Sequence, residues 1–148
     1  MKKIVTLATA SLAASALLAG LATPVHAAPD WNKRIRCKQK DWEGRVIPTR
    51  YGNSEFGWNH FTHRHNIKKC AVVEGPLNGK PDGRNGARLE YHGVAINGTR
   101  QVKIVVIVQW ARKTKDDRYD AGRGQKIGVI NAFCKNQNHN KCPNWVNQ

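Results

Sequence analysis

Three of the chain's six histidines fall within six residues, at His60, His63 and His65. Histidine is the side chain that can both accept and donate a proton near neutral pH. Cleavage of RNA needs a base for the 2′-hydroxyl, an acid for the 5′-oxygen leaving group, and a cation for the pentacoordinate phosphorane. Two histidines and a Lys or Arg meet these needs without a metal. The cluster therefore predicts acid–base chemistry on a phosphodiester.

The spacing of the histidines sets a geometric requirement. His60 and His63 share one side of a helix, whereas His60 and His65 lie about 140° apart around it. His60 and His65 reach one site only if the helix ends or bends near Asn66. A His-x-x-His metal site would need a third ligand, and no acidic residue is obviously placed. We expect neither metal nor cofactor. The plain alternative is that the histidines are exposed or packing residues of a helix.

Cations and a strand complete the predicted site. Asn131 and Phe133 alternate to one face of the last predicted strand, where they could hydrogen-bond a phosphate and stack a base. Trp58, beside the histidines, is a further candidate for substrate binding. The cationic candidates are Arg88 and Lys103 for catalysis and Lys126 for substrate binding.

The elements that must position these residues begin with a helix. Residues 56–72 have helical spacing of apolar positions, with Asn53 or Ser54 as the expected N-cap. Before it, residues 29–45 are polar and basic and predict an irregular arm. Residues 45–50 predict a short strand that Pro48 limits to a sheet edge. Residues 75–87 are rich in Gly and Pro and predict a loop.

Alternating patterns then predict an antiparallel meander. The expected strands are residues 88–96, 102–110 and 126–134, and residues 102–110 form the central strand. Asn97-Gly98 is a strong hairpin signal. The fold class is therefore α+β, with an N-terminal helix packed on one face of a three- to four-stranded antiparallel sheet.

The N-terminus predicts export. Lys2 and Lys3 precede an uncharged apolar run that ends in small residues, which predicts a signal peptide over residues 1–27. A retained membrane anchor is the alternative. Residues 28–148 are then one secreted domain with no stable membrane insertion after signal cleavage.

Four cysteines in an exported chain favour two disulfides. Three pairings are possible. Cys134 and Cys142 enclose a polar loop that could close on itself, which leaves Cys37 with Cys70. A zinc site is the weaker alternative, because no Cys-x-x-Cys pair exists.

The charge predicts an anionic partner. The chain carries a formal net charge of +15, and loss of Lys2 and Lys3 would leave about +13, more than solubility requires. Nucleic acid, an anionic envelope polymer and a membrane surface are the candidates.

Two segments resemble motifs of known protein domains. Residues 57–65 resemble the element G-x-x-H-[IF]-x-x-[RK]-H of bacterial toxin domains, and residues 127–133 resemble their late strand V-[IV]-T-A-[YF]. These domains are ribonucleases of the barnase/EndoU/colicin E5-D/RelE-like superfamily, in which a helix precedes an antiparallel sheet. The resemblance covers residues 56–134. It implies His60 and His65 as the acid–base pair, with His63 extra to the motif and Asn131 at a position where Thr or Ser is usual.

The expected function is thus a secreted cationic ribonuclease, an antibacterial toxin that cleaves RNA without metal. A cognate inhibitor protein would be a further partner. One alternative is a non-enzymatic cationic antimicrobial or envelope-binding protein, which the charge and five tryptophans also suit. Another is a disulfide-held inhibitor or adhesion module.

Overall fold

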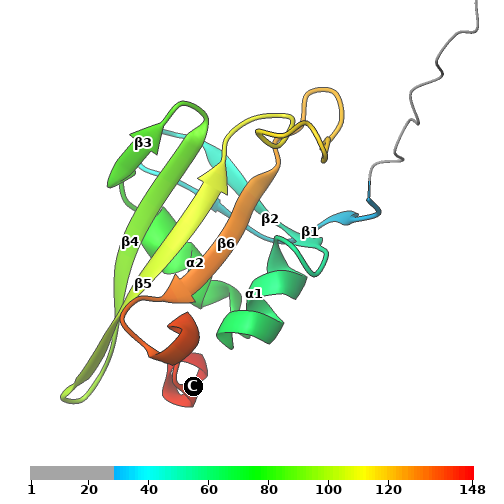
Figure 1. Ribbon diagram of the computed structural model, residues 1–148. Coiled ribbons are helices and arrows are strands. Elements are labelled where there is room, and N and C mark those ends of the chain that lie inside the picture. The colour runs from blue at the N-terminus through cyan, green and yellow to red at the C-terminus, as the bar shows by residue number, and fades with distance from the viewer. Residues whose placement is uncertain (1–28) are drawn as a thin grey trace, which may run out of the picture.

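The computed structural model describes residues 29–148 (Figure 1). The predicted signal peptide lies outside the described residues. The chain forms a two-stranded hairpin, two helices, a four-stranded antiparallel sheet and two 3₁₀ turns, which confirms the α+β class. The elements in chain order are β1 (Asn32–Lys40), β2 (Val46–Gly52), α1 (Trp58–His65), α2 (Cys70–Leu77), β3 (Gly83–Asn85), β4 (Arg88–Asn97), β5 (Arg100–Gln109), β6 (Gly128–Cys134), η1 (Asn138–Asn140) and η2 (Asn144–Asn147).

The large sheet has the order β3-β4-β5-β6, all antiparallel, so the predicted central strand does lie in the centre. The hairpin between β4 and β5 closes one residue later than predicted: Asn97 pairs with Arg100, and Gly98 adopts a φ of 61° in the turn. One face of the sheet carries alternating buried residues such as Tyr91 and Val106. This face packs against α2 and forms the core.

The N-terminal segment corrects the predicted fold. Residues 32–40 are not an irregular arm but strand β1, which pairs with β2 in a separate hairpin. Both helices follow this hairpin and precede the large sheet, so neither of them is the predicted N-terminal helix. Only Cys37 of β1 is buried, so the strand lacks an alternating apolar pattern. Pairing with β2 determines its structure instead, through a turn in which Asp41 accepts bonds from the backbone of Glu43 and Arg45.

The single helix predicted over residues 56–72 is also wrong. It divides into α1 and α2, because Asn66 adopts a left-handed conformation with φ 56° and ψ 40°. Asn tolerates this conformation better than most residues. Helix α1 begins after Gly57 without a side-chain cap, so neither Asn53 nor Ser54 is the N-cap. The predicted loop at 75–87 holds the end of α2 and the short strand β3.

Helix α2 lies directly against β4. A Cβ atom at Gly93 would meet the Cγ atom of Pro76 at 2.7 Å. The helix therefore approaches the strand as closely as it does because position 93 has no side chain. Figure 1 shows α2 behind the sheet and α1 beside β6.

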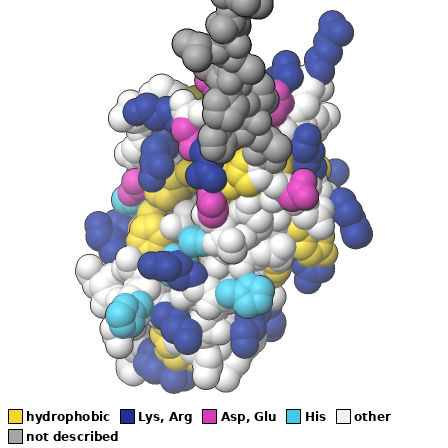
Figure 2. All heavy atoms as spheres, turned by 45° about the vertical axis from the view of Figure 1, so that its right-hand side comes forward, with side chains coloured by type: hydrophobic (Ala, Val, Ile, Leu, Met, Phe, Trp, Pro, Cys, Tyr) yellow, Lys and Arg dark blue, Asp and Glu magenta, His cyan; other side chains and the backbone are white. Residues whose placement is uncertain are grey.

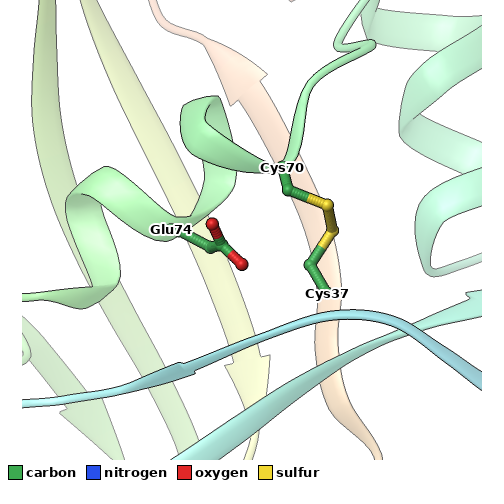
Figure 3. Close-up of side chains that lie close together, drawn as sticks. All are labelled: Cys37, Cys70 and Glu74. Atoms are coloured by element: carbon green, nitrogen blue, oxygen red, sulfur yellow. A yellow bond between two sulfur atoms is a disulfide. The ribbon is translucent and has the colours of Figure 1, made fainter.

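Both predicted disulfides are present. Cys37–Cys70 ties β1 to the first residue of α2, with Glu74 one turn further along the helix (Figure 3). Cys134–Cys142 closes the polar loop that follows β6. Among residues 29–148, no helix has both the length and the apolar character needed to cross a membrane.

Candidate functional site

Helix α1 is fixed at its start by β6 and by the core. The backbone N–H of Gly57 donates to the carbonyl of Ile130 at 3.0 Å. Gly57 has a φ of 78°, and a Cβ there would meet the carbonyl oxygen of Arg50 at 2.9 Å, so the position requires glycine. Trp58 and Phe61 bury their rings against each other in the core. His65 is buried on the same side of the helix, whereas His60 is half-buried and His63 is exposed.

The end of α1 is held by the C-terminal segment. The amide of Asn66 donates to the carbonyl of Cys142 at 2.8 Å and to Asn144 at 2.9 Å. Asn147 donates in turn to the carbonyl of Asn66 at 2.8 Å. The backbone N–H of Cys142 donates to the carbonyl of His65 at 2.8 Å. These bonds end the helix at His65, next to Asn66, where the spacing of His60 and His65 predicts a helix end.

His60 and His65 converge. Their ring centroids lie 5.6 Å apart in an edge-to-face arrangement. The ring of His65 also lies 5.8 Å from that of Phe133 on β6. The geometric requirement derived from the spacing is therefore met: two imidazoles from one short helix meet each other and the last strand.

The two histidines have different environments. His65 is only 5% exposed, and its Nδ1 is buried without a hydrogen-bond partner among the described residues. Burial, together with the positive charges of His60 and Arg64, lowers the pKa of His65 below 6.5. The lowered pKa favours the neutral imidazole of His65, the form that can accept a proton.

His60 opens instead into a hollow of about 650 Å³, which we call the histidine pocket. Its walls are Asn53, Ser54, Asn59, His60, His63 and Arg64. The Nδ1 atom of His60 lies 2.8 Å from the carbonyl of Ser54, and that of His63 lies 2.6 Å from the carbonyl of Asn59. A carbonyl only accepts, so each Nδ1 carries the proton and each Nε2 is left to exchange one with a ligand.

The sheet face opposite the core adds polar groups near this site. Asn131 and Phe133 pair with Ile107 and Val105, and residues directly opposite in a ladder share a face. Lys103 alternates with Val105 on the same face, so it is a diagonal neighbour of Phe133. Asn131 already accepts a bond from the backbone of Ala132. Phe133 thus lies against His65, and Asn131 and Lys103 share the sheet face of Phe133.

Three predicted residues lie elsewhere. Arg88 pairs with Gln109 at the other end of the sheet, four residues from the row of Phe133. Lys126 precedes β6 and places its ammonium 5.3 Å from the centroid of Trp110. Trp58 is only 7% exposed and is covered by Arg36. The structure does not bring Arg88 or Lys126 to the histidines, and it places Trp58 in the core.

Two groups were missed from sequence. Arg64 lines the histidine pocket, and its position inside the histidine cluster was the available signal. The second group is Glu90 and His92 on the outer sheet face, whose Oε1 and Nε2 atoms lie 2.6 Å apart. Their alternation with buried Leu89 and Tyr91 could have indicated that they share this face. Figure 2 shows histidines among Lys and Arg side chains, with acidic side chains mostly in the upper part of the view.

The described residues contain one group of three side chains with metal-ligand chemistry, Cys37, Cys70 and Glu74. Its two cysteines form a disulfide with each other, so they provide no thiolate. The histidine cluster is not part of such a group.

Comparison with known proteins finds no family model, no curated protein and no solved structure that matches the chain.

Proposed function

We propose that the protein is a secreted, metal-independent endoribonuclease, with His60 and His65 as its acid–base pair. The observation that supports this most directly is the convergence of the two imidazoles at 5.6 Å beside Phe133. Their environments suit opposite roles, because an acid–base mechanism needs one neutral and one protonated group.

In the proposed reaction, neutral His65 accepts the proton of the 2′-hydroxyl, which attacks the adjacent phosphorus. Protonated His60 donates from Nε2 to the departing 5′-oxygen. Arg64 and His63, in the histidine pocket, stabilise the charge that develops on the phosphorane. The products are a 2′,3′-cyclic phosphate and a free 5′-hydroxyl. The net positive charge of the chain supplies general attraction for the RNA backbone.

The test is cleavage of a short RNA by the purified mature chain in EDTA. We expect products with cyclic phosphate ends, and no cleavage where the attacking 2′-hydroxyl is replaced by hydrogen. His60→Ala and His65→Gln should each lower kcat by about 10²- to 10⁴-fold. His63→Ala should also lower kcat, but by less than the other two variants, because Arg64 remains to stabilise the phosphorane. Melting temperatures close to that of the unchanged chain would show that the variants remain folded.

An equal loss of kcat in His63→Ala, with His65→Gln unaffected, would assign the second catalytic role to His63. Intact RNA in every experiment would reject the proposal. Leakage of anionic vesicles by the same protein, abolished by reversal of Lys and Arg charges, would then favour a cationic binder. An antibacterial role and a cognate inhibitor belong to the ribonuclease proposal and depend on it.

A further inference from the structure

A second hollow lies on the other side of the segment that borders the histidine pocket. Asn53 and Ser54 line the histidine pocket, whereas Glu55 and Phe56 line the second hollow. Its volume is about 530 Å³, within the usual range for small-molecule sites. We call it the aromatic pocket. The lining residues used below are Phe56, Arg88, Gln109, Lys115, Tyr119 and Ile130.

The aromatic side chains of the apolar wall of this pocket pack against one another. The rings of Phe56 and Tyr119 lie 4.6 Å apart, and Trp31 packs behind both, at 5.1 Å and 6.2 Å. The Tyr119 hydroxyl donates to Glu55 at 2.7 Å and accepts from Asn53 at 3.2 Å. Phe56 and Tyr119 are only 6% and 4% exposed, so the part of this wall that a ligand can reach is small and fixed in place.

The charge in the aromatic pocket is unbalanced toward positive. Glu55 is paired with Arg118 at 3.1 Å, and Asp116 accepts from the hydroxyl of Thr114 at 2.6 Å. Between residues 29 and 148, neither Arg88 nor Lys115 forms an ion pair. Asp116 keeps its negative charge, so the lining holds three cations and two acids, a net charge of 3 − 2 = +1. Arg88 and Lys115, which form no ion pair, therefore complement an anion.

Gln109 adds a side-chain amide to the lining of the aromatic pocket. Gln109 pairs with Arg88 across the ladder, and its Nε2 lies 3.3 Å from the carbonyl of Lys113. Its side-chain oxygen makes no hydrogen bond within the described part of the chain, so it can accept from the edge of a heterocycle. A flat ring with a polar edge and a phosphate matches all three features of the pocket.

We propose that the aromatic pocket binds one nucleotide of a single-stranded RNA, its base against Phe56, Tyr119 and Ile130 and its phosphate at Arg88 and Lys115. Gln109 contacts the edge of the base. This inference deepens the proposed function and rests on it for the identity of the full substrate. Asn53 and Ser54 border one pocket and Glu55 and Phe56 the other, so the proposal places both pockets along one RNA strand.

The test is isothermal titration of the mature chain at low salt with each of the four 5′-mononucleotides, the matching nucleosides and ribose 5-phosphate. A mononucleotide has no internucleotide bond to cleave, so the readout is independent of catalysis. We expect at least one mononucleotide to bind about tenfold or more tightly than its nucleoside and than ribose 5-phosphate. Arg88→Ala with Lys115→Ala should weaken that binding by about tenfold or more.

The matched control is Lys38→Ala with Lys80→Ala, which removes the same charge from sites outside the pocket and should leave the affinity unchanged. Equal weakening by both pairs would overturn the inference, because it would indicate general attraction only. Equal binding of ribose 5-phosphate would also overturn it. Binding lost in His60→Ala but kept in the Arg88/Lys115 variant would reject this pocket and leave the ribonuclease proposal intact. Nucleotide binding here without any RNA cleavage would reject the ribonuclease proposal alone.

Discussion

At the scale of single residues, the informative contrast is between His65 and His60. His65 is buried between the end of α1 and β6, with two positive groups nearby. His60 keeps its Nδ1 on a backbone carbonyl and opens into a pocket. The same side chain therefore has two environments, and burial lowers the pKa of His65.

This lowered pKa makes the stability of the fold depend on pH. The unfolded chain takes up a proton at this residue near pH 6.5, whereas the folded chain takes it up only at lower pH. Stability should thus fall as pH drops from 6.5 toward the folded pKa, and the His65 contribution should be constant above 6.5. In His65→Gln, urea unfolding from about pH 8 to about pH 5 should show a smaller decline.

The matched control for that experiment is His139→Asn. This replacement removes one exposed histidine and suits the left-handed backbone at position 139, where φ is 51°. It should retain the decline of the unchanged chain. A decline of the same size in both variants would show that other groups are responsible.

At the scale of elements, the end of α1 positions the last residue of the site, His65. His60 and His65 both lie within α1, about 140° apart around an ideal helix, and their rings nevertheless lie 5.6 Å apart. The left-handed residue Asn66 and its bonds to the C-terminal segment end α1 immediately after His65. The conformation and the side-chain hydrogen bonds of Asn66 both contribute, and they can be separated by substitution.

Asn66→Ala should destabilise the fold by about 2–3 kcal/mol, because it loses the buried hydrogen bonds and strains a left-handed residue. Asn66→Gly loses the same bonds but relieves the backbone strain, so it should be about 1 kcal/mol more stable than the alanine variant. Urea unfolding of both variants measures the difference. Two variants of equal stability would show that the backbone conformation contributes nothing.

The contact between α2 and β4 gives a second prediction at this scale. Gly93→Ala should cost about 1–3 kcal/mol, because its methyl group would overlap Pro76. Gly75→Ala is the control within α2, where a methyl group would meet nothing within 4 Å. It should be neutral or stabilise the fold by up to about 1 kcal/mol. Thermal or urea unfolding distinguishes the two, and a harmless Gly93→Ala would contradict the close packing.

At the scale of the whole molecule, residues far apart in the chain build the site together. The loop closed by Cys134–Cys142 follows the last strand, yet it bonds to His65 and Asn66 at the end of the first helix. The other disulfide joins β1 to α2. The two bridges should therefore affect the site differently.

Cys134→Ala with Cys142→Ala should lower stability by about 2–5 kcal/mol and loosen the end of α1. Amide hydrogen exchange should then show reduced protection over residues 65–69, beyond the change that global stability explains. Cys37→Ala with Cys70→Ala is the comparison, and it should affect β1 more than residues 65–66. Identical protection of the end of α1 in both variants would contradict this division.

Local sequence patterns predicted several features of the structure. The run of Val and Ile in residues 102–110 predicted the central strand, because β-branched residues favour strands. The four cysteines and the predicted export favoured two disulfides, and the polar loop between Cys134 and Cys142 suggested the observed pairing. The spacing of His60 and His65 required a helix end near Asn66, and the helix ends there.

Tertiary structure alone decided the rest, because it depends on partners distant in sequence. Strand β1 buries one side chain and exists through pairing with β2. Arg88 suited catalysis and Lys126 suited substrate binding by type, but strand register places Arg88 at the far end of the sheet and Lys126 lies over Trp110. The aromatic pocket joins Phe56 to Tyr119, 63 residues apart, and no local pattern predicts such a contact. Sequence thus determined which chemistry is present, whereas long-range packing determined which of those groups meet.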